Sequence, residues 1–185
     1  MILPITLYGD PVLRKVTPEI DKDYPNLNEL IENMFETMYN AEGVGLAAPQ
    51  VGLNIRLFVA DATILADEDP QLKDFKKALI NPQIIERTGV EESMEEGCLS
   101  VPGIREDVSR PTKIRIQYYD TDWNFYDETY EGFAARVIQH EYDHLDGILF
   151  VDHCSTLRKR FLKGKLTNIA KGKIRAPYQV RPPRK

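Results

Sequence analysis

Two histidines four residues apart constrain the fold of this chain more than any other feature of its sequence. His140 and His144 lie in the run HEYDH, within a segment from about Gly132 to Asp146 whose apolar periodicity predicts a helix. Because an α-helix has 3.6 residues per turn, the two imidazoles lie one above the other on one face. Two imidazoles in that arrangement can bind a single divalent metal ion. The pattern therefore predicts a metal site on one face of this helix.

The neighbours of the two histidines agree with a metal site. Glu141 lies about 100° around the helix from His140, where its carboxylate can reach a water molecule next to a bound metal. Phe133 and Val137 continue the histidine face as an apolar stripe that would exclude water from the site. The alternative is a surface helix that carries two histidines by chance. The chain contains three histidines in all, and two of them fall in this pattern.

A catalytic zinc-type site needs a third protein ligand and an open position for water. Downstream of the helix the sequence offers Asp152, His153 and Cys154, although His153 has no partner at ligand spacing and is interpreted as an ordinary polar residue. Upstream, Cys98 follows Gly97 in a turn-like run, EGCLS, and a thiolate suits several divalent transition metals. Taken alone, a cysteine is more often a small buried apolar residue, so both alternatives stay open.

Length and composition favour a single globular domain that resides in a reducing compartment. The chain has 185 residues, of which 42% are hydrophobic and 29% charged. No run approaches the roughly 18 apolar residues of a membrane span, and the N-terminus does not have the pattern of a signal peptide. Two cysteines do not make a disulfide framework. We expect a cytoplasmic protein without membrane association.

Hydrophobic patterning predicts an α+β fold. An amphipathic helix is expected from Leu27 to about Met38, with Gly43 as its stop, and a third helix from a Ser155 cap to about Ala170. Short strands and one hairpin lie between the helices rather than alternating with them. We predict a catalytic domain over residues 1–175 and a flexible, Pro/Arg-rich tail over residues 176–185. The strands are expected at residues 55–60, 77–80, 84–87, 113–119 and 125–130.

Three segments, in order and spacing, resemble the signature motifs of peptide deformylases. They are GVGLAAPQ at residues 43–50, EGCLS at residues 96–100 and QHEYDHLDG at residues 139–147. The resemblance extends from GDPVLR at residues 9–14 to the end of the last helix, without a departure at any motif position. It implies a hydrolase that removes the formyl group from the N-terminal formyl-methionine of newly synthesised proteins. The implied fold has antiparallel β-sheets packed around a central metal-binding helix, with N-terminal and C-terminal helices.

The resemblance also assigns residues to roles. Cys98, His140 and His144 are implied as metal ligands, with Glu141 as the general acid/base. The side chain of Gln50 and the backbone N–H of Leu99 are implied as oxyanion donors. The expected native ion is Fe(II), and the ligand types also permit Zn(II), Ni(II) or Co(II).

The expected substrate-binding residues surround these groups. Gly45, with Val44 and Gly97 near it, provides backbone that can lie against an extended peptide. Phe133 and Val137 line a methionine-sized pocket or belong to the plain core, and Arg105 contacts the peptide or remains in solvent. Arg110 is expected to pair with Glu96 or to contact peptide carbonyls.

The charge distribution suggests a second partner. Residues 158–185 contain 11 basic and no acidic side chains, whereas residues 1–157 carry 13 basic and 29 acidic ones. Because the substrate is a nascent chain, this basic segment is expected to dock on ribosomal RNA phosphates, with Leu157, Phe161 and Ile169 packed on the body. Residues beyond about Gly172 are expected to be dispensable for hydrolysis of short formyl-peptides. No specific DNA binding is expected.

Two other functions fit part of the sequence. A metallopeptidase that cleaves internal bonds would take its third ligand from residues 152–154. A non-catalytic ribosome-binding protein would need a fourth protein ligand to close a structural metal site.

Overall fold

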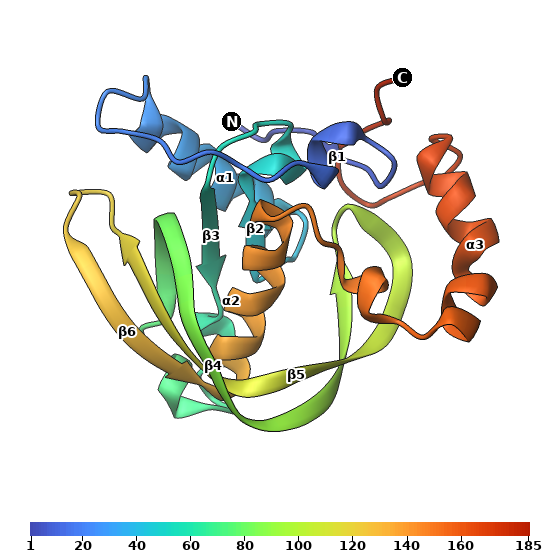
Figure 1. Cartoon of the computed structure of the whole chain (residues 1–185). Coiled ribbons are helices and arrows are strands. Elements are labelled where there is room, and N and C mark those ends of the chain that lie inside the picture. Colours follow the sequence, from blue (N-terminus) through green and yellow to red (C-terminus); the bar gives the residue numbers. More distant parts are fainter.

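A five-stranded antiparallel sheet wraps around one buried helix in the computed structural model, which describes residues 1–185 (Figure 1). The sheet order is β2-β3-β4-β5-β6, and a separate two-stranded parallel sheet joins β1 to β7 near the two termini. The strands are β1 (Ile5–Thr6), β2 (Gly45–Ala47), β3 (Leu57–Asp61), β4 (Lys76–Cys98), β5 (Val101–Tyr119), β6 (Phe125–Glu131) and β7 (Val180–Arg181). The helices are α1 (Leu27–Asn40), α2 (Gly132–Leu145) and α3 (Thr156–Ala170).

The central element is α2, as the resemblance to peptide deformylases implies. Eleven of its fourteen residues are buried, so it has no solvent-facing side of its own. Its apolar residues join β3, β4 and β5 in one core cluster, while α1 and β2 close a second cluster. The predicted α+β class, with antiparallel sheet around the metal-binding helix, is confirmed.

Strands β4 and β5 form one long hairpin, which Figure 1 shows curving beneath α2. Register shifts between Ile80 and Gln83, Ile84 and Glu86, and Thr88 and Glu91 mark bulges, which bend and twist paired strands. At the last of these, Gly89 has a φ of 82°, and a Cβ there would lie 2.3 Å from Thr112 Oγ1.

The sequence analysis predicted shorter strands than this hairpin contains. Two short strands were expected where β4 is continuous over 23 residues, and EGCLS was expected to be turn-like where Glu96, Gly97 and Cys98 end a strand. The alternation of charged and apolar residues is weak in residues 88–98 because most of those side chains are exposed.

The C-terminal tail differs from the expectation of a flexible segment. Val180 and Arg181 pair with Ile5 and Thr6, and the backbone N–H of Arg184 donates to Asp10 at 3.0 Å. The prediction of an unfolded tail from its Pro and Arg content is therefore wrong for residues 178–184. Composition alone did not reveal that β1 provides an edge with which this segment can pair.

Helix α3 begins at the predicted Ser155 cap, whose side chain accepts from the N–H of Arg158. Leu162 and Ile169 pack on the body, whereas Leu157 and Phe161 are 62% and 69% exposed. The expectation that Leu157 and Phe161 dock this helix is wrong. No helix in the structure is both long enough and apolar enough to cross a membrane.

Candidate active site

Cys98, His140 and His144 form one cluster of potential metal ligands. Their ligating atoms all lie within 4.8 Å of one another, and Cys98 Sγ lies 3.4 Å from His144 Nε2. The thiol comes from the end of β4, and both imidazoles come from the buried face of α2. The structure therefore brings Cys98 to two histidines that lie more than 40 residues further along the chain, in the set implied by the resemblance.

Glu96 fixes the orientation of one imidazole. His140 Nδ1 lies 2.8 Å from Glu96 Oε1, so Nδ1 carries the proton and donates, and Nε2 is left to face the cluster. Burial would raise the pKa of Glu96, but hydrogen bonds from His140 and Arg110 hold that pKa well below its usual range. Glu96 is therefore a carboxylate and a permanent acceptor.

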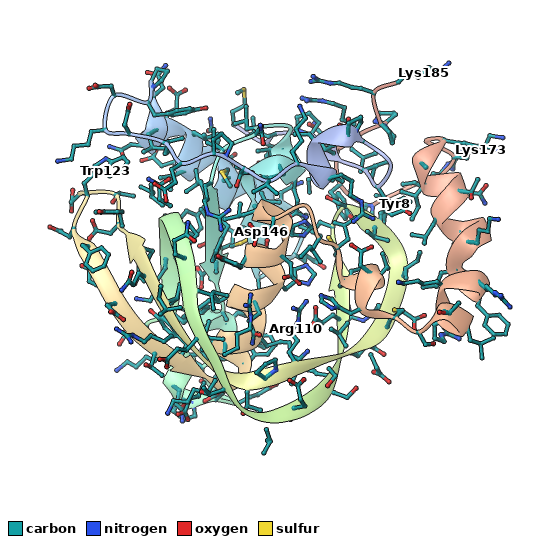
Figure 2. All side chains as sticks on the ribbon, in the orientation of Figure 1. Tyr8, Arg110, Trp123, Asp146, Lys173 and Lys185 are labelled. Carbon is teal, nitrogen blue, oxygen red and sulfur yellow. The ribbon has the colours of Figure 1, made fainter.

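Glu96 also pairs with two buried arginines. Arg110, which lies between β5 and α2 (Figure 2), donates to Glu96 at 2.7 Å and to Asp143 at 2.9 Å. Arg136 donates to Glu96 at 2.8 Å, and His153 Nε2 lies 2.9 Å from Asp143. The expected pairing of Arg110 with Glu96 is present. His153 is a neighbour of this network rather than a ligand.

The charges around the cluster favour a cation. Burial lowers the pKa of His140, but its hydrogen bonds to Cys98 and Glu96 outweigh burial and raise that pKa well above the usual value. Burial and the neighbouring His140 lower the pKa of His144, which keeps that imidazole neutral. One cation is thus stabilised between a thiol and a carboxylate. A divalent ion held by one thiolate and two imidazoles fits this position.

Glu141 lies beside the cluster with one oxygen free. Its side chain is buried, and Oε2 has no hydrogen-bond partner in the protein. Burial raises the pKa of Glu141 to about 7. Gly45 makes room for this carboxyl group, because a Cβ at Gly45 would lie 2.5 Å from Glu141 Oε1.

The Gln50 side chain is held so that its NH₂ group points toward the cluster. Its Oε1 accepts from the Ala47 N–H at 2.9 Å. Its Nε2 donates to Ser100 Oγ at 3.2 Å and lies 3.4 Å from Cys98 Sγ. The amide is buried, so these contacts fix which end of it faces the metal ligands.

The turn between Cys98 and Val101 is anchored on its carbonyl side. Tyr8 N–H donates to the Ser100 carbonyl at 2.8 Å, and the Tyr178 hydroxyl donates to the Leu99 carbonyl at 2.8 Å. The N–H of Leu99 donates to no acceptor within the protein. A backbone donor is therefore left free immediately after Cys98.

A cleft of about 550 Å³ opens over these groups. All six expected substrate-binding residues line it, namely Val44, Gly45, Gly97, Arg105, Phe133 and Val137. The cleft is also lined by Gln50, Cys98, Leu99, His140 and Glu141.

Pro177 and Tyr178 line the cleft as well. The sequence did not indicate this, because the tail was interpreted as unfolded.

Comparison with known proteins identifies the family. The family model described as polypeptide deformylase matches residues 2–160. The chain belongs to the peptide deformylase family. It is 58% identical to the peptide deformylase of Christiangramia forsetii over 99% of this chain and 97% of that one. It is 55% identical to the peptide deformylase of Cytophaga hutchinsonii over 99% and 98% of the two chains.

Solved deformylase structures share the fold as well. The enzyme from Thermus thermophilus superposes with a TM-score of 0.82 at 39% identity, covering 94% of this chain and all of that one. The enzyme from Synechococcus elongatus, in complex with actinonin, gives a TM-score of 0.77 at 38% identity, covering 97% and 92%. Deformylases are metal-dependent hydrolases that remove the N-formyl group from newly synthesised proteins. The sequence prediction of this activity is confirmed for this member.

Proposed function

We propose that Cys98, His140 and His144 hold one divalent metal ion, natively Fe(II), for the deformylation reaction. We further propose that Glu141 is the general acid/base, and that the Gln50 side chain and the Leu99 N–H bind the oxyanion. One observation carries this assignment: the three ligand atoms lie within 4.8 Å of one another, and Cys98 and His140 line the same cleft as Glu141, Gln50 and Leu99.

The ligand set suits a catalytic metal rather than a structural one. Three protein ligands leave a coordination position open, as in other hydrolytic metal sites. When bound, such an ion supplies Lewis acidity and lowers the pKa of a water molecule toward neutrality. A thiolate with two imidazoles permits Fe(II), Zn(II), Ni(II) or Co(II), and Fe(II) is proposed on the resemblance to the family.

Glu141 has the position and acidity of a proton carrier. A pKa near 7 allows a carboxylate to take a proton from the attacking water and to return it as an acid at neutral pH. Its unpartnered Oε2 is available for that proton. As the formyl C–N bond breaks, Glu141 delivers the proton to the departing amine of the methionine.

Two donors are placed to stabilise the oxyanion. Gln50 Nε2 and the Leu99 N–H flank Cys98, and the first is oriented by Ala47 while the second has no competing acceptor. A donor of this kind contributes roughly 3–4 kcal/mol to transition-state stabilisation. Both groups are fixed before substrate arrives, so the reaction does not have to reorganise them.

The remaining cleft residues fit an extended peptide. Val44 precedes the edge strand β2, and Gly45 begins it, so peptide backbone can lie alongside. Phe133 and Val137 line the cleft and also contact the core cluster. They can therefore belong to the core and line a methionine-sized pocket at the same time. Arg105 is exposed and pairs with Glu95, which places it at the rim.

The rival peptidase site has little support. Its third ligand would come from residues 152–154, but Asp152 pairs with Arg14, and His153 contacts Asp143. Cys154 is buried outside the ligand cluster, and burial raises the pKa of its thiol. These contacts favour Cys98 as the third ligand.

The decisive experiment combines metal analysis with an assay of formate release. Anaerobically purified protein is expected to contain one Fe(II) per chain and to release formate from formyl-Met peptides. Exposure to air is expected to inactivate it by oxidation of metal and thiolate. An active protein free of transition metal, or one that cleaves internal peptide bonds instead, would contradict the proposal.

We also propose that α3 and the segment after it dock on the ribosome through RNA phosphates. Lys159, Lys163 and Lys165 are exposed on α3, and Lys173 extends outward beyond its end (Figure 2). Arg158 donates to Glu106 at 3.1 Å and is therefore excluded from the docking set.

Charge reversal at Lys159, Lys163 and Lys165 should weaken co-sedimentation with ribosomes, and wild-type binding should fall steeply as salt rises. Reversal at Lys22, which is exposed on the acidic body, is the matched control. Binding that does not depend on salt, or that both variants reduce equally, would refute the docking surface.

A further inference from the structure

The C-terminal segment reaches the active-site cleft. Pro177 and Tyr178 both line it, although they are about 80 residues after the Cys98 turn in sequence. The Tyr178 hydroxyl donates to the Leu99 carbonyl at 2.8 Å, so the tail is attached directly to the turn that follows a metal ligand. Burial raises the pKa of Tyr178 to about 12, which keeps this hydroxyl protonated at neutral pH.

Backbone hydrogen bonds on the C-terminal side hold Tyr178 in place. Ile5 N–H donates to the Gln179 carbonyl at 2.9 Å, and Leu7 N–H donates to the Arg181 carbonyl at 3.2 Å. Together with the β1–β7 pairing, these bonds fix the backbone immediately after Tyr178. The backbone that carries the ring is therefore ordered where the C-terminal segment pairs with the N-terminal strand β1.

The depth of the cleft indicates which part of a peptide the tail would meet. The reacting end is buried, with Gln50 and Glu141 only 1% and 4% exposed. Pro177 is exposed and Tyr178 is half-buried, so the tail forms the outer part of the wall. A peptide with its formyl group at Glu141 extends outward toward the rim of the cleft, and Pro177 and Tyr178 line that cleft. The residues that follow the formyl-methionine are the ones that reach the rim.

We propose that Pro177 and Tyr178 form an outer wall of the peptide-binding cleft, and that Tyr178 contacts the substrate residues after the formyl-methionine. The inference rests on the proposed orientation of substrate at Glu141. An aromatic ring provides a broad contact surface at little cost in side-chain entropy. The wall therefore favours longer peptides over formyl-dipeptides. The expectation that residues beyond Gly172 are dispensable for hydrolysis of short formyl-peptides stays a prediction, and the wall limits it to peptides too short to reach Tyr178.

The test compares substrates of different length in holoenzyme variants. For wild type, Tyr178→Ala, Tyr178→Phe and Gln179→Ala, kcat and KM are measured with formyl-Met-Ala and with formyl-Met-Ala-Ser-Lys. Tyr178→Ala should reduce the tetrapeptide-to-dipeptide ratio of kcat/KM by about three- to tenfold, mainly through KM, since one aromatic contact is lost. Tyr178→Phe keeps the ring and loses only the bond to Leu99, so its loss should be smaller. Gln179→Ala, an exposed neighbour, should retain the wild-type ratio.

A binding measurement separates this inference from the proposed function. Fluorescently labelled Met-Ala-Ser-Lys should bind more weakly to Tyr178→Ala than to wild type, and thermal melting of each variant verifies folding. If wild type releases no formate but the two proteins differ in binding, the proposed function fails and the wall stands. Equal binding and an unchanged length ratio in Tyr178→Ala would overturn the wall.

Discussion

Glu96 Oε1 lies 2.8 Å from His140 Nδ1, so the strand that supplies Cys98 also orients the imidazole opposite it. Glu96 and Cys98 are two residues apart in β4, and side chains at that spacing point to the same face of a strand. One strand end therefore supplies both a ligand and the acceptor that aligns a second ligand. It therefore matters that β4 continues to Cys98, because a loop would not hold the Glu96 and Cys98 side chains in a fixed relative orientation.

Glu96→Gln should weaken metal binding while leaving all three ligands in place. The amide cannot accept from His140 and both buried arginines as a carboxylate does, so His140 loses its fixed orientation. Loss of such an outer hydrogen bond typically reduces metal affinity by roughly 10–100-fold. Competition with a chelator measures the effect. Glu95→Gln, at an exposed pair with Arg105, is the control and should retain wild-type affinity.

Cys98→Ala should strip or weaken the metal, whereas Cys154→Ala should keep it. Only Cys98 lies in the ligand cluster, and Cys154 packs in an apolar cluster with residues such as Leu162. Metal content per chain, measured after gel filtration, distinguishes the two. Equal metal content in wild type and Cys98→Ala would rule out the three-ligand site.

The sequence predicted what depends on local spacing and missed what depends on distant contacts. The helix that carries His140 and His144 follows from its periodicity, and its observed end at Leu145 lies one residue from the expected one. The Ser155 cap was equally local. By contrast, the partners of Glu96 come from β5 and α2: Arg110 was one expected partner, but no spacing in the sequence indicates that Arg136 and His140 also meet Glu96.

The C-terminal tail is a second case in which a long-range contact could not be predicted from the local sequence. Pro and Arg content favours disorder, yet Val180 and Arg181 pair with a two-residue edge at the other end of the chain. That pairing places Tyr178 in the cleft, and nothing in the local sequence marks Tyr178 as functional. Long-range strand pairing depends on an available partner edge, which local composition does not encode.

Gly45→Ala should reduce kcat without removing the metal. The added Cβ would lie 2.5 Å from Glu141 Oε1, so the carboxyl group must move. Displacing a catalytic group by about 1 Å can reduce the rate by about 10²-fold. Gly164→Ala is the control, because nothing lies within 4 Å of a Cβ there, and alanine should raise helix stability by about 1 kcal/mol. A Gly45→Ala enzyme with normal kcat and bound metal would disprove this steric role.

Glu141→Gln should retain the metal and lose turnover. The substitution preserves the shape of the side chain and removes its ability to accept and return a proton, at a cost on the order of 10²-fold or more in kcat. Glu131→Gln, at an exposed pair with Lys113, is the matched control and should keep normal kcat. Near-normal turnover by Glu141→Gln, with metal content unchanged, would exclude Glu141 as the general acid/base.

The attachment of α3 should depend on pH through Glu106. A hydrogen bond from Arg158 is the largest cause of the lowered pKa of Glu106, and burial acts in the opposite direction. Because the folded pKa is depressed, the contribution to stability is present above the unfolded pKa and is lost as pH falls through the folded value. Hydrogen exchange of α3 amides should therefore be faster in Glu106→Gln than in wild type at pH 7. The two should converge in acid, once Glu106 is protonated in the folded wild type, and at high salt, where an exposed pair is screened. Glu68→Gln, at an exposed acidic residue outside every ion pair, is the control and should match wild type throughout. If wild type and Glu106→Gln still differed in acid, the ion pair would not be what holds α3.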